Sequence, residues 1–242
     1  MIVVLPAMTQ AQERAWLTML EVFERVGPSW CLVGGQMVHL YCAERGFAPN
    51  RATEDADIVL DVRAHPDVLE RFTRVLVELG WAPAGVTLEG HQHRWIGSGA
   101  QLDVLIPTGL GIRAAGRRGA DGGTTLATRG GQQALDRAEL VTVDVAGRTG
   151  QVPRPDMTGA LVIKAAAYTN PQDPHRLRHL IDFAVLAAMV RRGDISPDTL
   201  RAGDLRYLRP TIQDLALRPD IVASIDGADR GLDVLGRICQ RR

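Results

Sequence analysis

Three aspartates occupy positions that could bind divalent metal ions. Asp55 and Asp57 lie two residues apart at the start of an apolar stretch, residues 56–62, and Asp103 lies inside a second one, residues 102–106. Alternate residues of an extended chain point to the same side, so the carboxylates of Asp55 and Asp57 are predicted to share one face. Two such charges repel each other unless a cation neutralises them or water solvates them. Because Mg²⁺ takes carboxylate oxygens and keeps waters that phosphate can replace, this spacing favours a magnesium site.

Asp103 strengthens that interpretation, because an unpaired carboxylate in an apolar strand is costly to bury. If its strand lies beside the strand of Asp55 and Asp57, the three carboxylates form one cluster able to hold two Mg²⁺ ions. Such a pair of ions activates an attacking oxygen and stabilises a leaving pyrophosphate. The alternative is a structural ion pair between Asp103 and an arginine, which we rank below the metal site.

A pair of glycines suggests where an anion could bind. Gly34 and Gly35 follow the short apolar run Trp30–Val33 and open a predicted helix over residues 36–45. Small residues at this point let backbone amides approach an anion at the N-terminus of the helix. A plain tight turn explains the same glycines, so the pair alone is a weak signal.

Lys164 is the only lysine among the 28 basic residues of the chain. A compact ammonium on a flexible stem and a planar guanidinium are not interchangeable, so a lone lysine can mark a place where the guanidinium does not fit. Compositional drift explains a single lysine equally well.

Helices and short strands alternate in the first part of the chain and must position these residues. Thr9-Gln10-Ala11-Gln12 has the form of a capping box and predicts a helix that ends near Gly27-Pro28. Pro66–Leu79 has helical spacing, with a proline suited to the first turn. Strands are predicted over 30–33, 56–62, 86–89, 93–96 and 101–106, and a hairpin over 140–145 and 150–153.

The second part of the chain contains a glycine-rich segment and, after it, a series of predicted helices. Residues 109–131 contain eight glycines and four arginines, at 113, 117, 118 and 129, and predict a long mobile loop or disordered insert. Helices are predicted over 157–169 and 174–192, with a short one after Pro197 and one or two more up to Arg241. The predicted fold class is therefore α+β: a mixed sheet with helices in a first domain, 1–155, followed by an all-helical domain, 156–242.

The composition excludes collagen-like, coiled-coil and disordered chains, because 45% of the residues are hydrophobic and 23% are charged. No apolar run approaches the roughly 20 residues of a membrane span, and the three cysteines are too scattered for a disulfide framework. We therefore expect a cytoplasmic protein without a membrane partner. The formal net charge is zero, yet residues 1–107 carry −5 and residues 108–242 carry +5. This division suits a phosphate substrate, or a simple attraction between the two halves.

Three of these segments together resemble the signature of the nucleotidyltransferase superfamily. The signature is a Gly-Gly or Gly-Ser turn, an Asp-x-Asp on the next strand and a third Asp further on, matched here by 32–35, 51–58 and 102–104. Two later segments, 160–167 around Lys164 and 177–183 around Asp182, resemble the AbiEii-type branch of that superfamily. The branch includes toxins of toxin–antitoxin and phage-defence systems that transfer nucleotides, in some cases onto tRNA ends.

The resemblance implies a role for the matched acids and glycines. Gly34 and Gly35 would hold the β- and γ-phosphates of a nucleoside triphosphate. Asp55, Asp57 and Asp103 would bind Mg²⁺, and Asp103 would also orient the acceptor hydroxyl or accept its proton.

In the helical part, the resemblance implies that Lys164 contacts the triphosphate and that Asp182 orients Lys164 through an ion pair. The alternative for Asp182 is an ordinary helix pair with Arg178, four residues earlier. Three further residues are weaker nucleotide-binding candidates, each with an alternative. Gln36 stands where the superfamily often has a serine on the triphosphate, a contact that backbone amides could make instead. Arg51 could contact phosphate or balance the acids, and Tyr168 could stack on a base or be an ordinary buried tyrosine.

The histidines and the loop arginines carry less weight. His175 and His179 share a helical face, but a zinc site needs more ligands than these two. His91 and His93 are predicted to be surface residues. The arginines of 109–131 could bind an RNA backbone, although a solvated loop is the favoured interpretation.

The predicted function is Mg²⁺-dependent transfer of a nucleoside monophosphate from a nucleoside triphosphate to an acceptor hydroxyl. RNA, and tRNA in particular, is the predicted acceptor, with the chain acting as an AbiEii-like toxin that has a cognate antitoxin. One alternative is a small-molecule nucleotidyltransferase that modifies antibiotics, against which the basic C-terminal half argues mildly. The other is a catalytically degenerate fold that serves only as a binding protein.

Overall fold

The structure is a computed structural model and describes residues 1–240. In chain order the elements of the first part are β1 (Ile2–Val4), α1 (Gln10–Val26), β2 (Trp30–Val33), α2 (Gly34–Arg45), β3 (Ala56–Leu60), α3 (Val68–Glu78), β4 (Ala82–Pro83), β5 (Arg94–Gly97), β6 (Ala100–Pro107), α4 (Ile112–Ala115), β7 (Leu126–Thr128), α5 (Gly131–Leu135), β8 (Ala138–Val145) and β9 (Arg148–Pro155). The rest is helical: α6 (Met157–Tyr168), α7 (Leu177–Ala188), the 3₁₀ helix η1 (Pro197–Thr199), α8 (Ala202–Ala216), α9 (Pro219–Ala223) and α10 (Ala228–Gln240).

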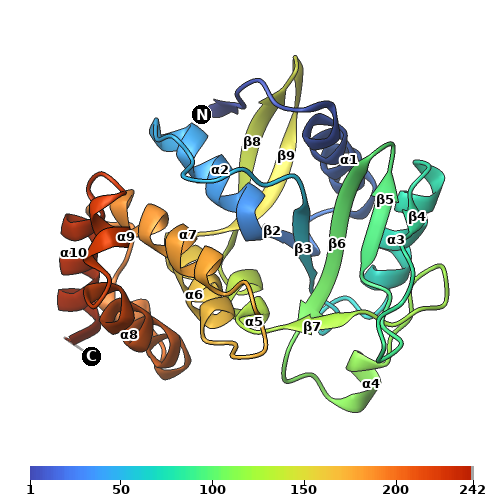
Figure 1. The fold of residues 1–242 in the computed structure, drawn as a ribbon. Helices are drawn as coiled ribbons and strands as arrows, with labels where there is room; N and C mark the ends of the chain where they lie inside the picture. Colours follow the sequence, from blue (N-terminus) through green and yellow to red (C-terminus); the bar gives the residue numbers. More distant parts are fainter. Residues whose placement is uncertain (241–242) are drawn as a thin grey trace.

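The larger sheet has six strands in the order β2-β3-β6-β5-β4, with β7 also paired to β6. β3 runs parallel to β6 but antiparallel to β2, and β5 runs antiparallel to β6 (Figure 1). α1 and α3 pack against each other beside this sheet, where the ring of Trp30 in β2 meets Phe72 of α3 edge-on with centroids 5.9 Å apart. The mixed sheet with its helices confirms the predicted α+β class.

A second sheet contains the predicted hairpin. β8 and β9 pair antiparallel, and β1 adds to β8 in parallel. The turn between β8 and β9 is Ala146-Gly147, and both residues have a positive φ (51° and 86°), as a two-residue type I′ turn requires. The hairpin confirms the prediction and extends it, because the strands run from Ala138 to Pro155.

Local sequence signals account for the starts of two helices. Thr9 and Gln12 form the predicted capping box at α1, with each side chain accepting from the other residue's backbone N–H at 3.2 and 2.9 Å. α2 begins two residues earlier than predicted, at Gly34, directly after the last residue of β2. The glycine pair therefore forms the first turn of the helix itself.

Two predictions about irregular segments were wrong. Residues 86–89 form no strand; Val86 and Leu88 are exposed, and the backbone N–H of Thr87 donates instead to the carbonyl of His91 in a local turn. The insert 109–131 is not structureless, because it contains α4 and the strand β7, which pairs in parallel with Leu105–Pro107 of β6. An edge of β6 left free beyond β5 supplies the backbone partners that order this glycine-rich segment.

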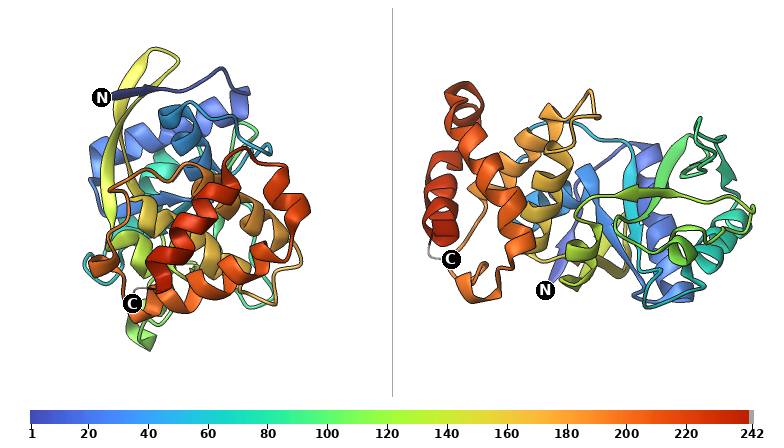
Figure 2. Two further views of the ribbon diagram at one scale, coloured as in Figure 1. Left: turned by 90° about the vertical axis from the view of Figure 1, so that its left-hand side faces the viewer. Right: turned by 90° about the horizontal axis from the view of Figure 1, so that it is seen from below.

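The helices from α6 onward lie at one end of the molecule, with α8, α9 and α10 furthest from the large sheet (Figures 1 and 2). They agree with the predicted helical part, although α7 is shorter than the 174–192 that we predicted, and Arg241 lies outside the described residues. The division into two domains at 155/156 stays a prediction. Within residues 1–240, every helix is too short or too polar to cross a lipid bilayer.

Candidate active site

Strand pairing brings the three predicted metal ligands together. Asp57 in β3 lies opposite Asp103 in β6 in the parallel register, and Asp55 comes two residues before Asp57. Each of the three carboxylates has an oxygen within 4.8 Å of an oxygen of the other two. Such an all-oxygen donor set is the kind that Mg²⁺ prefers, so the residues fit a divalent ion of that class. This is the one group of three or more His, Cys, Asp or Glu side chains within residues 1–240 that could hold a metal ion.

The electrostatics of the cluster favour a cation. Burial, reinforced by the neighbouring charges of Asp55 and Asp103, raises the pKa of Asp57 to about 7. A bound cation would stabilise the charged form of a carboxylate whose pKa is raised in this way.

The Gly-Gly turn makes room for the acids. Gly34 has φ +70°, and a Cβ built on it would lie 1.8 Å from Oδ2 of Asp57. A Cβ on Gly35 would lie 2.4 Å from Oγ1 of Thr53. Both glycines are therefore required by the close approach of α2 to the residues around Asp57. The same junction places the N-terminus of α2, with its partial positive charge, beside the carboxylates and against a cavity.

Gln36 lies near the site but is not among the residues that line this cavity. Its buried amide accepts from Nε1 of Trp16 at 3.1 Å and donates to the carbonyl of Thr53 at 2.9 Å. Thr53 in turn donates from Oγ1 to Asp55 at 3.0 Å. The geometry gives Gln36 a bracing role behind the acidic strand in place of the predicted contact with the triphosphate.

A buried ion-pair network forms the opposite wall. Lys164 of α6 places Nζ 2.7 Å from Oδ2 of Asp182 in α7, and both side chains are buried. Arg51, in the segment that leads to β3, donates to both oxygens of Asp182 at 2.9 and 2.8 Å. Although burial alone would raise it, the cations of Lys164 and Arg51 lower the pKa of Asp182 to about 2. The predicted ion pair of Lys164 with Asp182 is thus present, and Arg51 pairs with Asp182 in place of the acidic cluster.

Asp182 does not form the helix pair with Arg178 that was the predicted alternative for its role. The ion-pair partner of Arg178 is Asp173, at 3.8 Å, and Asp173 also lies 3.0 Å from Nε2 of His179. Burial, with Lys164 and Arg178 nearby, lowers the pKa of His179 to about 4, so its ring is neutral at pH 7. His91 and His93, predicted at the surface, are both partly buried.

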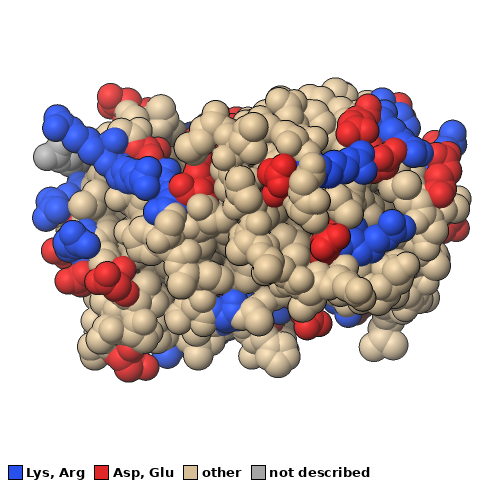
Figure 3. All heavy atoms as spheres, turned by 90° about the horizontal axis from the view of Figure 1, so that it is seen from above, with Lys and Arg blue, Asp and Glu red and all other residues tan. Residues whose placement is uncertain are grey.

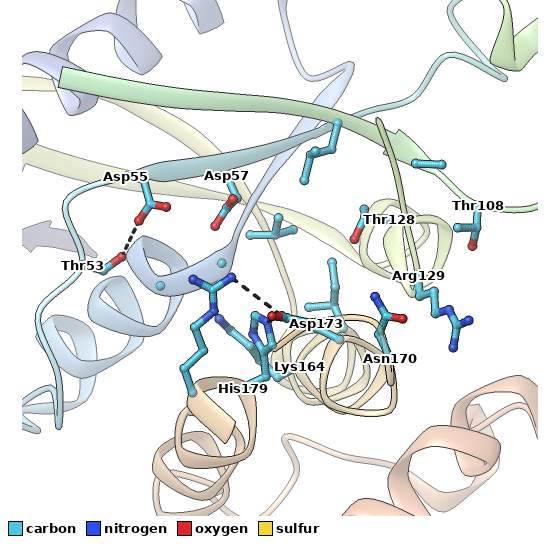
Figure 4. A pocket seen from close by; sticks show the side chains of 18 of the residues that line it. Thr53, Asp55, Asp57, Thr108, Thr128, Arg129, Lys164, Asn170, Asp173 and His179 are labelled. Atoms are coloured by element: carbon cyan, nitrogen blue, oxygen red, sulfur yellow. Dashed lines mark hydrogen bonds and ion pairs between the residues drawn. The ribbon is translucent and has the colours of Figure 1, made fainter. Parts of the chain in front are cut away.

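One cavity of about 400 Å³ joins these parts, a size typical of small-molecule sites. Figure 4 shows Asp55 and Asp57 on one side and Lys164 and His179 facing them from the helices. At the far end of the cavity lie residues that sequence reasoning did not place in the site: Thr108, Thr128, Arg129 and Asn170. Most of these follow from the pairing of β7 with β6, which the sequence pattern did not reveal.

Two further residues differ from their predicted settings. Tyr168 is absent from the cavity wall, because its hydroxyl donates to Asp214 at 2.9 Å and its ring lies under the guanidinium of Arg176. Asp103 accepts from Nε and Nη2 of Arg94 at 3.0 and 2.9 Å, so the predicted grouping of the three carboxylates and the alternative ion pair of Asp103 are both present.

Comparison with known proteins identifies the fold. No family model and no curated protein matches the sequence. The structure is similar to the crystal structure of an antigenic nucleotidyltransferase-like protein from Paracoccidioides brasiliensis, with a TM-score of 0.53 and 16% sequence identity over 93% of this chain and 94% of that chain. The AbiEii-type branch stays a prediction. At this identity the likeness concerns architecture, and it shows that the chain has a nucleotidyltransferase-like fold.

Proposed function

We propose that this chain is a divalent-metal-dependent nucleotidyltransferase, which moves a nucleoside monophosphate from a nucleoside triphosphate to an acceptor hydroxyl. The observation that carries the proposal is one cavity on which three elements converge. It brings the glycine N-terminus of α2, the carboxylates of β3 and the ammonium of Lys164 to the same space. The likeness in fold to a nucleotidyltransferase-like protein supports it.

The proposed reaction is an in-line displacement at the α-phosphorus. The acceptor oxygen forms a bond to the α-phosphorus, the bond from that phosphorus to the α,β-bridging oxygen breaks, and pyrophosphate leaves with that electron pair. The hydroxyl proton passes to solvent or to a carboxylate, and Asp103 as its acceptor stays a prediction. Such a reaction is accelerated mainly by positioning and by neutralising charge on the phosphates.

Each wall of the cavity has a task in this reaction. Gly34 and Gly35 offer backbone N–H groups to the phosphates at the start of α2. Lys164, oriented by Asp182, adds a positive charge, and Arg51 anchors the segment before Asp55 to the same carboxylate. Asp55, Asp57 and Asp103 would hold Mg²⁺, which when bound polarises the phosphate oxygens.

We propose RNA, and tRNA in particular, as the acceptor, and a role as an AbiEii-like toxin in the cytoplasm with a cognate antitoxin. The support is the net charge of +5 in residues 108–242 and the exposed Arg129 at the cavity. An exposed arginine beside the cavity attracts a polyanionic acceptor and repels a cationic antibiotic.

The experiment is an incubation of the purified protein with each α-³²P-labelled nucleoside triphosphate, Mg²⁺ and total RNA. We expect label in RNA, and at least a hundredfold lower kcat/KM for Asp57→Asn, because the site loses a charge at its centre. Asp67→Asn, the same change at an exposed carboxylate, should retain full activity.

The other outcomes separate the remaining functions. In a parallel reaction with an aminoglycoside-type small molecule in place of RNA, label on that molecule and none on RNA would favour antibiotic modification. Nucleotide bound by the wild-type protein without any transfer would favour a binding protein and contradict the proposal.

A further inference from the structure

Arg94 provides the acidic cluster with a cation of its own. It lies on β5, directly opposite Asp103 of β6 in the antiparallel register. Its guanidinium donates to both oxygens of Asp103, at 3.0 and 2.9 Å, in the two-point geometry that is strongest for this pair of groups. A guanidinium stays charged throughout the physiological pH range, so Arg94 always faces the three carboxylates as a cation.

The two partners of this ion pair differ in burial. The side chain of Asp103 is 9% exposed, whereas that of Arg94 is 45% exposed. Asp103 is therefore fixed in the sheet, while the guanidinium can move outward into water. Gln101, two residues before Asp103 in β6, offers Arg94 a second acceptor. In the orientation that satisfies its amide, Oε1 lies 3.1 and 3.2 Å from Nε and Nη2 of Arg94.

The acids themselves are also unequal. Asp55 and Asp57 line the cavity, and no ion pair engages either of them within residues 1–240. Asp103 is set back from the cavity, and both its oxygens are engaged by Arg94. A divalent ion can reach Asp55 and Asp57 without disturbing Arg94, but an ion that uses Asp103 must share that carboxylate with the guanidinium or displace it.

We propose that Arg94 is a built-in competitor that makes the cluster bind its two divalent ions unequally, the weaker one being the ion that requires Asp103. This inference rests on the metal site of the proposed function. Its consequence is that the complete set of ions assembles only when a substrate phosphate or the acceptor adds ligands or draws Arg94 away. Arg94 would thereby limit futile hydrolysis of a nucleotide bound without its acceptor.

Titration with Mn²⁺ alone, without nucleotide, tests this inference by calorimetry and by the electron paramagnetic resonance signal of free Mn²⁺. For the wild-type protein we expect one tighter and one weaker Mn²⁺. Arg94→Gln should tighten the weaker one by roughly threefold to tenfold, the scale of a partly exposed ion pair. Arg94→Lys keeps the charge but not the two-point contact, and should tighten it by less.

The matched control is Arg74→Gln, which removes the same charge from another ion pair, that of Arg74 with Glu70 on α3. Unchanged or weaker Mn²⁺ binding in both Arg94 variants would overturn the inference, as would an equal gain in Arg74→Gln. Should Arg94→Gln not fold by circular dichroism, the Lys variant decides alone.

The outcome is distinguishable from that of the proposed function. If the protein shows this pattern of Mn²⁺ binding but transfers no nucleotide, the inference about Arg94 stands and the proposed function is wrong. Absence of any Mn²⁺ binding in the wild-type protein overturns the inference together with the metal site.

Discussion

Gly34, the first residue of α2, lies directly against the carboxylate of Asp57. Its positive φ disfavours any side chain, and the space where a Cβ would lie is taken by the carboxylate of Asp57. The glycine therefore leaves the space that the side chain of Asp57 occupies, and it also lets an anion approach the start of the helix. A replacement should affect both folding and the metal site.

Gly34→Ala tests this, with Gly46→Ala as the control. Gly46 has nearly the same φ, +74°, but a Cβ added there would meet nothing within 4 Å, so it isolates the backbone cost of about 1 kcal/mol. We expect Gly34→Ala to lower the free energy of unfolding by roughly 2 kcal/mol more than Gly46→Ala, because Asp57 must move. Mn²⁺ binding should weaken in Gly34→Ala alone. Urea denaturation and Mn²⁺ titration measure the two effects, and equal losses in both variants would contradict the argument.

At the scale of residues, the sequence predicted what depends on strand geometry. The convergence of Asp55, Asp57 and Asp103 followed from the two-residue period and from a guess that their strands are neighbours, which the register confirms. The partner of Asp103 could not be predicted, because Arg94 reaches it only through the antiparallel register of β5. Gln36 differs for another reason: its position in the family resemblance suggested a contact with the triphosphate, but the direction of its side chain depends on how α2 is rotated.

Three separate elements are held together at Asp182. It is the common partner of Lys164 in α6 and of Arg51 in the segment before β3, while it lies itself in α7. Lys164 lies 18 positions before Asp182 in the sequence and Arg51 lies 131 positions before it, so the network links local and distant parts of the chain. Loss of this one carboxylate leaves two cations without their partner.

Asp182→Asn should lower the free energy of unfolding at pH 7 by about 3 kcal/mol, because it leaves the buried charges of Lys164 and Arg51 without their anionic partner. The pKa of Asp182 is about 2 in the folded protein, below its ordinary value of 3.8. Its contribution is therefore fully present above that ordinary value and is lost as the pH falls toward 2. Urea denaturation from pH 7 to pH 3 should show the gap between wild type and variant narrowing. Asp220→Asn, at an exposed carboxylate of α9, should have the same free energy of unfolding as the wild type. A difference between Asp182→Asn and the wild type that stays constant with pH would contradict the lowered pKa of Asp182.

The sequence predicted elements well where the period of apolar residues is strong, as in α1 and α3. It failed for β7, a strand of three residues inside a glycine-rich segment. Such a strand has no periodicity of its own and exists because β6 offers free backbone groups over Leu105–Pro107. The same failure hid Thr128 and Arg129 from the predicted site, since both follow from this pairing.

At the scale of the whole molecule, the opposite net charges of the two halves do not appear as two separate patches on the face drawn in Figure 3. Figure 3 shows basic and acidic side chains together at both ends of one face, with few charges between them. Many of the arginines are paired with acids, as Arg148 is with Glu21. Attraction of a polyanion must therefore come from arginines that have no acid partner.

Arg113, Arg118 and Arg129 meet that condition: they are exposed, and none of them forms an ion pair within residues 1–240. Arg129 lines the cavity, and the other two belong to the same insert. If the acceptor is RNA, these side chains are placed to bind phosphates next to the site of transfer.

Replacing all three by Gln should weaken RNA binding and flatten its dependence on salt, because each lost phosphate contact removes about 0.7 from the slope of log K against log salt on a single strand. Fluorescence anisotropy of labelled tRNA over a roughly fourfold range of salt, from about 50 to 200 mM, measures both. The control triple Arg206, Arg230 and Arg237 to Gln removes the same charge from α8 and α10. An equal loss in the control would mean that RNA responds only to net charge. A flatter slope in the insert variant alone would locate the path of the acceptor along the insert 109–131, since charge removed at a distance leaves the number of phosphates in contact unchanged.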